Sequence, residues 1–282
     1  MIAMHAERFA AMGTRVELHL FGSDDRDALC MARRAIEAVD EALTIHRPSA
    51  TTALNACLMA SRPCRIDDAV LLDALIEIEA AYAATHGLFD PAADASRPGG
   101  WNRVSFDRDN ACIEASRPVA LDFGGFGKGF ALDRACSVLR AAGITSAFLC
   151  AGESSIAVVG EHPLGGGWPV AIPHPLRDGH FLAELELRDE ALSISSTVGA
   201  GTRAPDRAAM IRPTDTSVVT APRSAVAIDR SGARAEVMST ALLVADDVQA
   251  GRLLHGGPAR RLLFDFSREA AMPVQSDEMI LQ

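Results

Sequence analysis

The sequence contains a single lysine, Lys128, among its 282 residues, and its other long cationic side chains are all arginines. Aromatic residues make up only 5% of the chain, and the net charge is −10 with no run of basic residues. Nucleic-acid backbones and anionic membrane surfaces both require a basic face, so the sequence predicts neither as a partner. No apolar run reaches the ~18 residues that indicate a membrane span.

Cysteine pairs spaced as metal or redox motifs are also missing. The six cysteines are scattered, with no CxxC and no Cys/His cluster, which favours structural thiols in a reducing compartment over disulfides or zinc. The first 22 residues have no basic segment followed by a long apolar run, and no lipoprotein-like cysteine follows them. The sequence therefore predicts a cytoplasmic protein.

Hydrophobic periodicity and capping residues predict several helices. They are expected at 24–44, 67–87, 129–142 and 235–247, and the segment 45–63 is expected to be a loop with at most short structure. Gly143 should end the third of these helices.

Strands are more numerous and occur in runs. They are expected at 14–21, 110–114, 118–123, 144–150, 154–160, 168–172, 181–187, 191–195, 216–220, 224–228 and 260–266. Runs of strands favour the α+β class, with layered helices on largely antiparallel sheets, over a doubly wound parallel sheet. We expect two lobes within one compact unit and a single domain over residues 1–282.

The lone lysine lies in a glycine cluster, DFGGFGKGF, between a predicted strand and a predicted helix. Unpaired N–H groups at a helix start favour an anion, and glycines allow a ligand to approach the backbone. The cluster is neither a P-loop, since Gly129 follows Lys128, nor a Rossmann fingerprint, since Phe130 stands at the third glycine position. Spacing alone leaves two interpretations open, an anion site or a tight turn with a surface lysine.

Seven short motifs, taken together and in order, resemble the ApbE family, the FAD:protein FMN transferases. The matching segments are AMGT (11–14), RPSATTALN (47–55), GLFDPA (87–92), LDFGGFGKGFALD (121–133), LCAGESSIAVVG (149–160), SISST (193–197) and EVMST (236–240). They extend over roughly residues 9–265, so the resemblance covers nearly the whole chain.

The resemblance implies a flavin transferase that binds FAD and Mg²⁺, transfers FMN to a Thr or Ser hydroxyl of an acceptor flavoprotein, and releases AMP. By the same match, the flavin nucleotide should contact Met12, Thr14, Leu88, Phe89, Asp90, Gly124, Gly125, Gly127 and Lys128. The metal should be held by the Gly125 carbonyl, Glu236 and Thr240. Glu236 and Thr240 are spaced i, i+4 and would face one side of a helix, although Glu236 also suits a helix start.

The sequence departs from the family pattern in three segments. Glu236 stands where the family has aspartate, and SISST lacks the family's glycine. The segment 208–216 lacks the histidine that the family places near the flavin phosphate, and Arg212 stands at its aspartate position. The sequence therefore leaves the catalytic residue unassigned, and a different base or none would serve an active transferase. Three interpretations stay open: an active FMN transferase, a flavin-binding protein without transfer activity, and an FAD pyrophosphatase.

Overall fold

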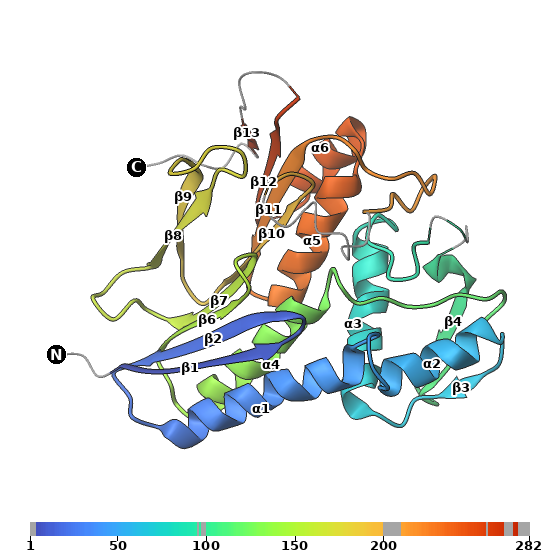
Figure 1. Ribbon diagram of the computed structural model, residues 1–282, viewed down its shortest axis with the longest axis horizontal. Helices are drawn as coiled ribbons and strands as arrows, with labels where there is room; N and C mark the ends of the chain where they lie inside the picture. The colour runs from blue at the N-terminus through green and yellow to red at the C-terminus, as the bar shows by residue number, and fades with distance from the viewer. Residues whose placement is uncertain are drawn as a thin grey trace.

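The structure is a computed structural model that describes residues 4–94, 96, 100–199, 210–257, 259–267 and 273–275. An eight-stranded sheet forms its centre (Figure 1), and all of the strand pairs in it are antiparallel. In order across the sheet, the strands are β1 (Met4–Ala11), β2 (Thr14–Phe21), β6 (Ser146–Ala151), β7 (Ser155–Gly160), β10 (Ala191–Ser196), β11 (Arg223–Asp229), β12 (Arg260–Asp265) and β13 (Pro273–Gln275). The prediction of largely antiparallel sheets is confirmed.

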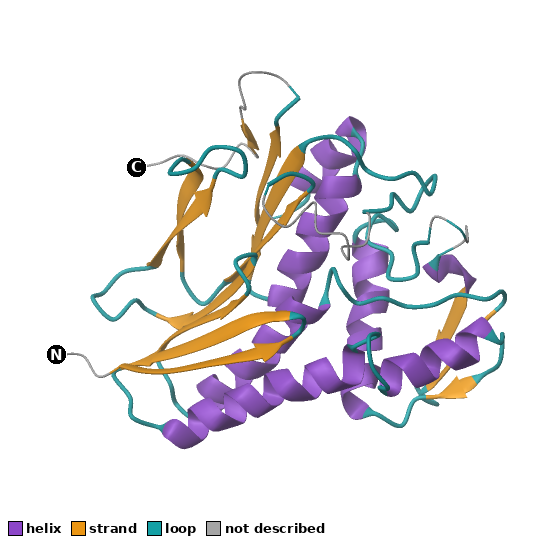
Figure 2. Ribbon diagram, in the orientation of Figure 1, coloured by secondary structure: helices purple, strands orange, loops and turns teal. Residues whose placement is uncertain are grey.

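Different elements cover the two faces of this sheet, and alternating residues of β11 pack against each of them. Val226 and Ile228 of β11 pack with Trp168 of a hairpin made by β8 (Trp168–Pro173) and β9 (Phe181–Leu187). Ala225 precedes Val226 and therefore points to the opposite face, where it belongs to the larger core that includes the helices. Figure 2 shows the hairpin on one side of the sheet and the helices on the other.

The described residues form six α-helices. They are α1 (Arg26–Leu43), α2 (Ala50–Met59), α3 (Ala69–Ala84), α4 (Gly127–Ala141), α5 (Gly232–Val244) and α6 (Asp247–His255), with a short 3₁₀ turn at Trp101–Arg103. A small sheet of β3 (Cys64–Arg65), β5 (Cys112–Ala115) and β4 (Val104–Asp107) lies beside α2 and α3 (Figure 1). The α+β prediction, with helices layered on antiparallel sheets, is confirmed.

The segment 45–63, expected to be a loop, contains the ten-residue helix α2. Its start is a capping box in which the Ser49 hydroxyl accepts from Thr52 N–H, and the Thr52 hydroxyl accepts from Ser49 N–H. A threonine in the place of the usual Glu or Gln completes the box, so the standard signature does not reveal it.

Residues 118–123 and 216–220, expected to be strands, form none. At Leu121 an asparagine replaces the neighbouring strand: Asn55 Nδ2 donates to the Leu121 carbonyl at 2.9 Å, and Leu121 N–H donates to Asn55 Oδ1 at 2.8 Å. Within 216–220 the only β-pairing is an isolated bridge between Val218 and Ile211.

Conversely, the sequence does not predict β1, because its pattern of exposed and half-buried residues carries little apolar signal.

In the part of the chain that the structure describes, no helix has the length and apolar character needed to cross a membrane.

Candidate active site

The glycine cluster forms the turn into α4, and Gly125 is enclosed on two sides. A Cβ at Gly125 would lie 2.9 Å from the Thr240 hydroxyl and 3.3 Å from the Phe89 ring. The helix begins at Gly127, and Phe126 at its N-cap has no side-chain oxygen to accept from the first-turn amides. Gly127 N–H donates to the Phe123 carbonyl at 2.7 Å, and the amides that follow it have no such acceptor in the Phe126 side chain.

Two glycines allow α4 and α5 to meet at backbone distance. A Cβ on Gly129 would lie 2.1 Å from the carbonyl oxygen of Gly232, and a Cβ on Gly232 would lie 2.7 Å from the carbonyl oxygen of Gly129. Real Cβ atoms do not approach backbone so closely, so both positions need glycine. This contact places the first turns of the two helices side by side.

Each helix then supplies a carboxylate that caps the other. Glu236 of α5 accepts a hydrogen bond from Gly129 N–H at 2.6 Å. Asp133 of α4 accepts from Gly232 N–H at 2.6 Å and from Ala233 N–H at 3.0 Å. Negative charge is favourable at a helix N-terminus, so this reciprocal capping fixes both carboxylates in the space between the helices.

The second oxygen of Glu236 is also occupied. Lys128 Nζ pairs with Glu236 Oε1, while Gly129 N–H holds Oε2. The glutamate side chain is only 4% exposed and the lysine side chain 22% exposed. The single lysine of the sequence is thus an internal ion-pair partner at the end of the glycine loop, which excludes the simple surface-lysine alternative.

A cleft of about 1050 Å³ opens in front of this pair. Of the residues predicted for the site, it is lined by Leu88, Phe89, Asp90, Gly124, Gly125, Lys128, Glu236 and Thr240. They come from three segments widely separated in the sequence: the segment after α3, the glycine loop and α5. The structure therefore brings most of the predicted residues to one place.

Met12, Thr14 and Gly127 are not among the described residues that line the cleft, and Thr14 lines a separate, open pocket at the β1–β2 turn. Met12 occupies a tight turn between β1 and β2, with a φ of +55°, and its Cε lies 2.8 Å from where a Cβ on Gly127 would stand. The Thr14 hydroxyl lies 2.8 Å from the Cβ position of Gly152, which precedes the lining residue Glu153. Met12 and Thr14 therefore lie near residues that adjoin the lining, and the predicted flavin contact of all three residues stays a prediction.

Asp90 lines the cleft and also organises its own loop. Its Oδ1 accepts from Ala92 N–H at 2.8 Å, and both of its oxygens lie 3.0 Å from Trp101 N, whose N–H they share. Burial raises the pKa of this carboxyl, and the backbone hydrogen bonds work in the opposite direction. Gly100 completes the arrangement, because a Cβ there would lie 1.9 Å from Asp90 Oδ2.

Several polar residues of the cleft were not singled out individually from the sequence. Ser193 and Ser195 alternate along β10 and share hydrogen bonds with Ser239, at 3.1 and 2.9 Å. The two-residue period of a strand could have placed this pair on one face. His174, between two prolines in the β8–β9 hairpin, also lines the cleft, and its Nδ1 accepts from Leu176 N–H at 3.1 Å. Its position carries no sequence signal.

The segment 208–216, which departs from the family pattern, is described from Met210 onward; residues 208 and 209 lie outside the described residues. Met210, Ile211 and Pro213 line the cleft. Arg212 is absent from the lining, and its Nε donates to the carbonyl of Val244, the last residue of α5, at 3.0 Å. The arginine at the family's aspartate position therefore caps the C-terminal end of α5.

The donor chemistry of the site suits Mg²⁺. The described residues contain no group of three or more His, Cys, Asp or Glu that could hold a metal ion. The cleft instead offers the Glu236 carboxylate and the Thr240 hydroxyl beside the Gly125 backbone. Mg²⁺ is commonly bound through one or two carboxylates together with waters and substrate phosphates, and such a sparse set of oxygen donors fits that habit.

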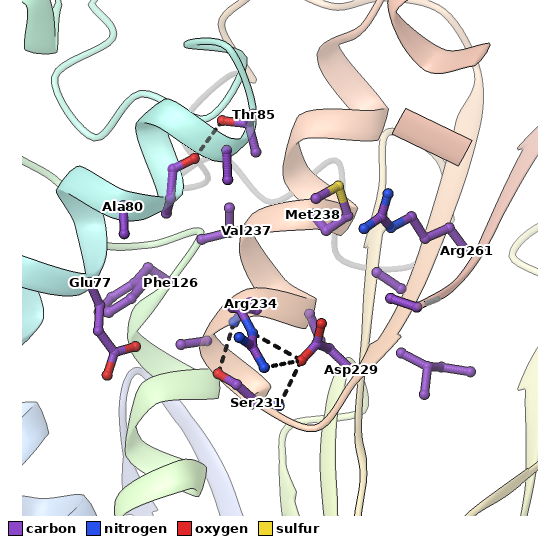
Figure 3. A pocket seen from close by; sticks show the side chains of 17 residues that line it. Glu77, Ala80, Thr85, Phe126, Asp229, Ser231, Arg234, Val237, Met238 and Arg261 are labelled. Carbon is purple, nitrogen blue, oxygen red and sulfur yellow. Dashed lines mark hydrogen bonds and ion pairs between the residues drawn. The ribbon is translucent and has the colours of Figure 1, made fainter. Parts of the chain in front are cut away.

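A second cavity of about 580 Å³ lies on the other side of α5. Figure 3 shows Glu77 on one wall, Arg261 and Met238 on the opposite wall, and Val237 between them. Apolar and small side chains make up most of its described lining, which includes none of the predicted site residues. We therefore take the first cleft as the candidate active site.

Comparison with known proteins agrees with the fold. The family model described as the ApbE family matches residues 93–261, more than half of the chain. The chain belongs to the ApbE family.

Solved structures match over almost the full length. The flavin transferase ApbE from Vibrio cholerae has 17% sequence identity and a TM-score of 0.83, with 98% of both chains covered. The apo form of the flavinyl transferase ApbE from Pseudomonas stutzeri has 18% identity and a TM-score of 0.82, with 98% of this chain and 95% of that chain covered. The ApbE protein from Thermotoga maritima has 18% identity, a TM-score of 0.83 and coverage of 98% and 97%. At these identities the matches establish the fold, and a search of curated proteins returned no match.

Proposed function

We propose that this protein is a flavin transferase that moves FMN from FAD to a Thr or Ser hydroxyl of an acceptor protein, with AMP as the leaving group. We further propose that residues 1–282 act as one flavin transferase domain. The observation that carries the proposal is the convergence of the glycine loop, Lys128, Glu236 and Thr240 on one large cleft. Membership of the ApbE family supports flavin transfer in general.

The start of α4 is suited to a diphosphate. The glycine loop lets a ligand approach the backbone closely, and Lys128 adds a compact cation at its end. The cleft volume of about 1050 Å³ slightly exceeds the roughly 300–1,000 Å³ typical of small-molecule sites, which is appropriate for a dinucleotide.

Charge in the cleft supports the need for a divalent cation. Its described lining carries six carboxylates and one lysine: Asp90, Asp94, Asp122, Glu153, Asp178, Glu236 and Lys128. A diphosphate entering so acidic a cleft would be repelled unless positive charge accompanied it. Bound Mg²⁺ would neutralise phosphate charge, held by Glu236, Thr240 and the Gly125 carbonyl.

In the proposed reaction, the acceptor hydroxyl oxygen bonds to the FMN phosphorus while the bond from that phosphorus to the bridging oxygen breaks. The bridging oxygen leaves with AMP, and the hydroxyl proton passes to solvent water. Phosphoryl transfer of this kind depends mainly on positioning and charge stabilisation. The glycine loop and Lys128 would hold the diphosphate, and the cleft walls at Phe89 and Ile194 would exclude water from the apolar flavin.

The direct test is incubation of the protein with FAD, Mg²⁺ and an acceptor flavoprotein domain that carries a reactive threonine. We expect covalent FMN on the acceptor, seen by mass spectrometry, and one AMP for each FMN transferred. FAD binding without either product would refute the transferase and indicate a flavin-binding protein. AMP with free FMN would indicate FAD pyrophosphatase activity, with water in place of the hydroxyl.

Lys128→Ala provides a binding test that is independent of the acceptor. It should weaken FAD binding, measured by quenching of flavin fluorescence at a temperature where circular dichroism shows the variant to be folded, because loss of the partner of buried Glu236 also lowers stability. Arg140→Gln removes an equal charge from an exposed position on the same helix and should leave FAD affinity unchanged. Equal FAD affinity of Lys128→Ala and wild type would contradict the role given to Lys128.

A further inference from the structure

The Lys128–Glu236 pair occupies the carboxylate that the proposed metal site requires. Glu236 Oε1 is paired with Lys128 Nζ, and Oε2 accepts from Gly129 N–H at 2.6 Å. Both oxygens of the one acidic side chain in the proposed metal set are therefore engaged within the protein. The side chain is only 4% exposed, so it has little surface left for another ligand.

This engagement follows from the way α4 and α5 pack. The close contact of Gly129 with Gly232 brings the start of α4 within reach of a side chain one turn along α5. Residue 236 is four positions after Gly232 and lies on the same face of α5. A glutamate at this position reaches the uncapped amide of Gly129, and Lys128 from the same turn of α4 then neutralises it.

We infer that Lys128 and a divalent cation compete for Glu236, so that the lysine must leave the carboxylate before the metal is bound. The inference rests on the proposed function, since it takes Glu236 as a ligand of the metal. Two cations held at one buried carboxylate repel each other strongly, so binding of the metal weakens the contact with Lys128 and the reverse. Lys128 thereby keeps the carboxylate neutralised when no metal is present. Once released, its ammonium is free to meet the diphosphate.

Metal binding without FAD tests the competition. We would titrate apo protein with Mn²⁺, following free Mn²⁺ by electron paramagnetic resonance, and confirm with Mg²⁺ by calorimetry. Lys128→Gln should bind Mn²⁺ about tenfold more tightly than wild type, because the partly buried competing charge is gone. Arg140→Gln makes the same change in net charge on the exposed end of α4 and should bind Mn²⁺ within about twofold of wild type. Glu236→Gln should abolish the binding.

The single lysine offers a second readout in the unaltered chain. Acetylation by a dilute activated ester, followed by mass spectrometry of the peptide containing Lys128, reports how accessible this amine is. Saturating Mg²⁺ should speed acetylation of Lys128 several-fold in wild type, because the amine is released from Glu236. In Glu236→Gln the amine has no carboxylate partner there, so the rate should be high with or without Mg²⁺.

The results separate the inference from the proposed function. Three outcomes would overturn the competition, even if FMN transfer is observed. They are Mn²⁺ binding by Lys128→Gln that is equal to or weaker than that of wild type, Mn²⁺ binding by Glu236→Gln at wild-type affinity, and an acetylation rate of Lys128 that Mg²⁺ does not change. Tighter binding by Lys128→Gln together with metal-dependent acetylation would support it, even if the acceptor assay fails. In that case only the transferase proposal falls.

Discussion

Replacing Gly129 with alanine should force α4 and α5 apart. The new methyl would lie 2.1 Å from the carbonyl oxygen of Gly232 and 2.3 Å from its carbonyl carbon. Both are backbone atoms, so no flexible side chain can move aside. Overpacking of this kind costs about 1–3 kcal/mol. Loosening the Glu236 cap would add about 1 kcal/mol, and the better helix propensity of alanine would offset about 1 kcal/mol.

The net expectation is a loss of about 1–3 kcal/mol in the free energy of unfolding. At ~2 °C per kcal/mol for a chain of this size, the Tm should fall by about 2–6 °C, measured by differential scanning calorimetry. Gly251→Ala is the matched control, because a Cβ there meets nothing within 4 Å and the position lies inside α6. It should be neutral or stabilising by up to about 1 kcal/mol. A Gly129→Ala variant as stable as Gly251→Ala would refute the reasoning.

Two other predictions concern capping and burial. Asp133→Asn removes one acceptor oxygen from the start of α5 and should lower the free energy of unfolding, measured by urea denaturation, by about 1–2 kcal/mol. Asp73 forms an exposed ion pair, so the free energy of unfolding of the control Asp73→Asn should stay within about 0.5 kcal/mol of wild type. Equal losses in both variants would contradict the capping role. Burial raises the pKa of Cys136 to about 12 and that of Cys150 to about 11. Because the thiolate is the reactive form, buried Cys136 and half-buried Cys150 should resist iodoacetamide at pH 8 in the folded protein and react in urea. Rapid alkylation of the folded protein at pH 8 would contradict the raised pKa values of these thiols.

The fold follows from the sequence where local signals agree. Helices α1 and α3 combine apolar faces with aspartate N-caps, Asp25 and Asp68, whose side chains accept first-turn amides as expected. The strand prediction for 118–123 is wrong because a side chain makes the hydrogen bonds that the backbone of a neighbouring strand would make. Asn55 satisfies Leu121 in place of a neighbouring strand, and no local pattern reports a partner 66 residues away.

The site likewise has features that short motifs predict and features that depend on tertiary packing. The glycine loop and the i, i+4 pair on α5 were recognisable from short motifs, and the structure places both on one cleft. The occupation of Glu236 by Lys128 and Gly129 could not be foreseen, because it depends on the close packing of two helices. His174 reaches the cleft through the β8–β9 hairpin, whose position over the sheet is set by tertiary packing.

The reciprocal capping of α4 and α5 also bears on synthesis of the chain. Gly129 and Glu236 are 107 residues apart, so α4 emerges from the ribosome long before the residue that caps it. At ~5–20 residues per second, that interval is roughly 5–20 s. During this time the nascent chain holds the glycine loop and Lys128 without their acidic partner. The nascent protein would therefore acquire a complete site only late in translation, when α5 docks.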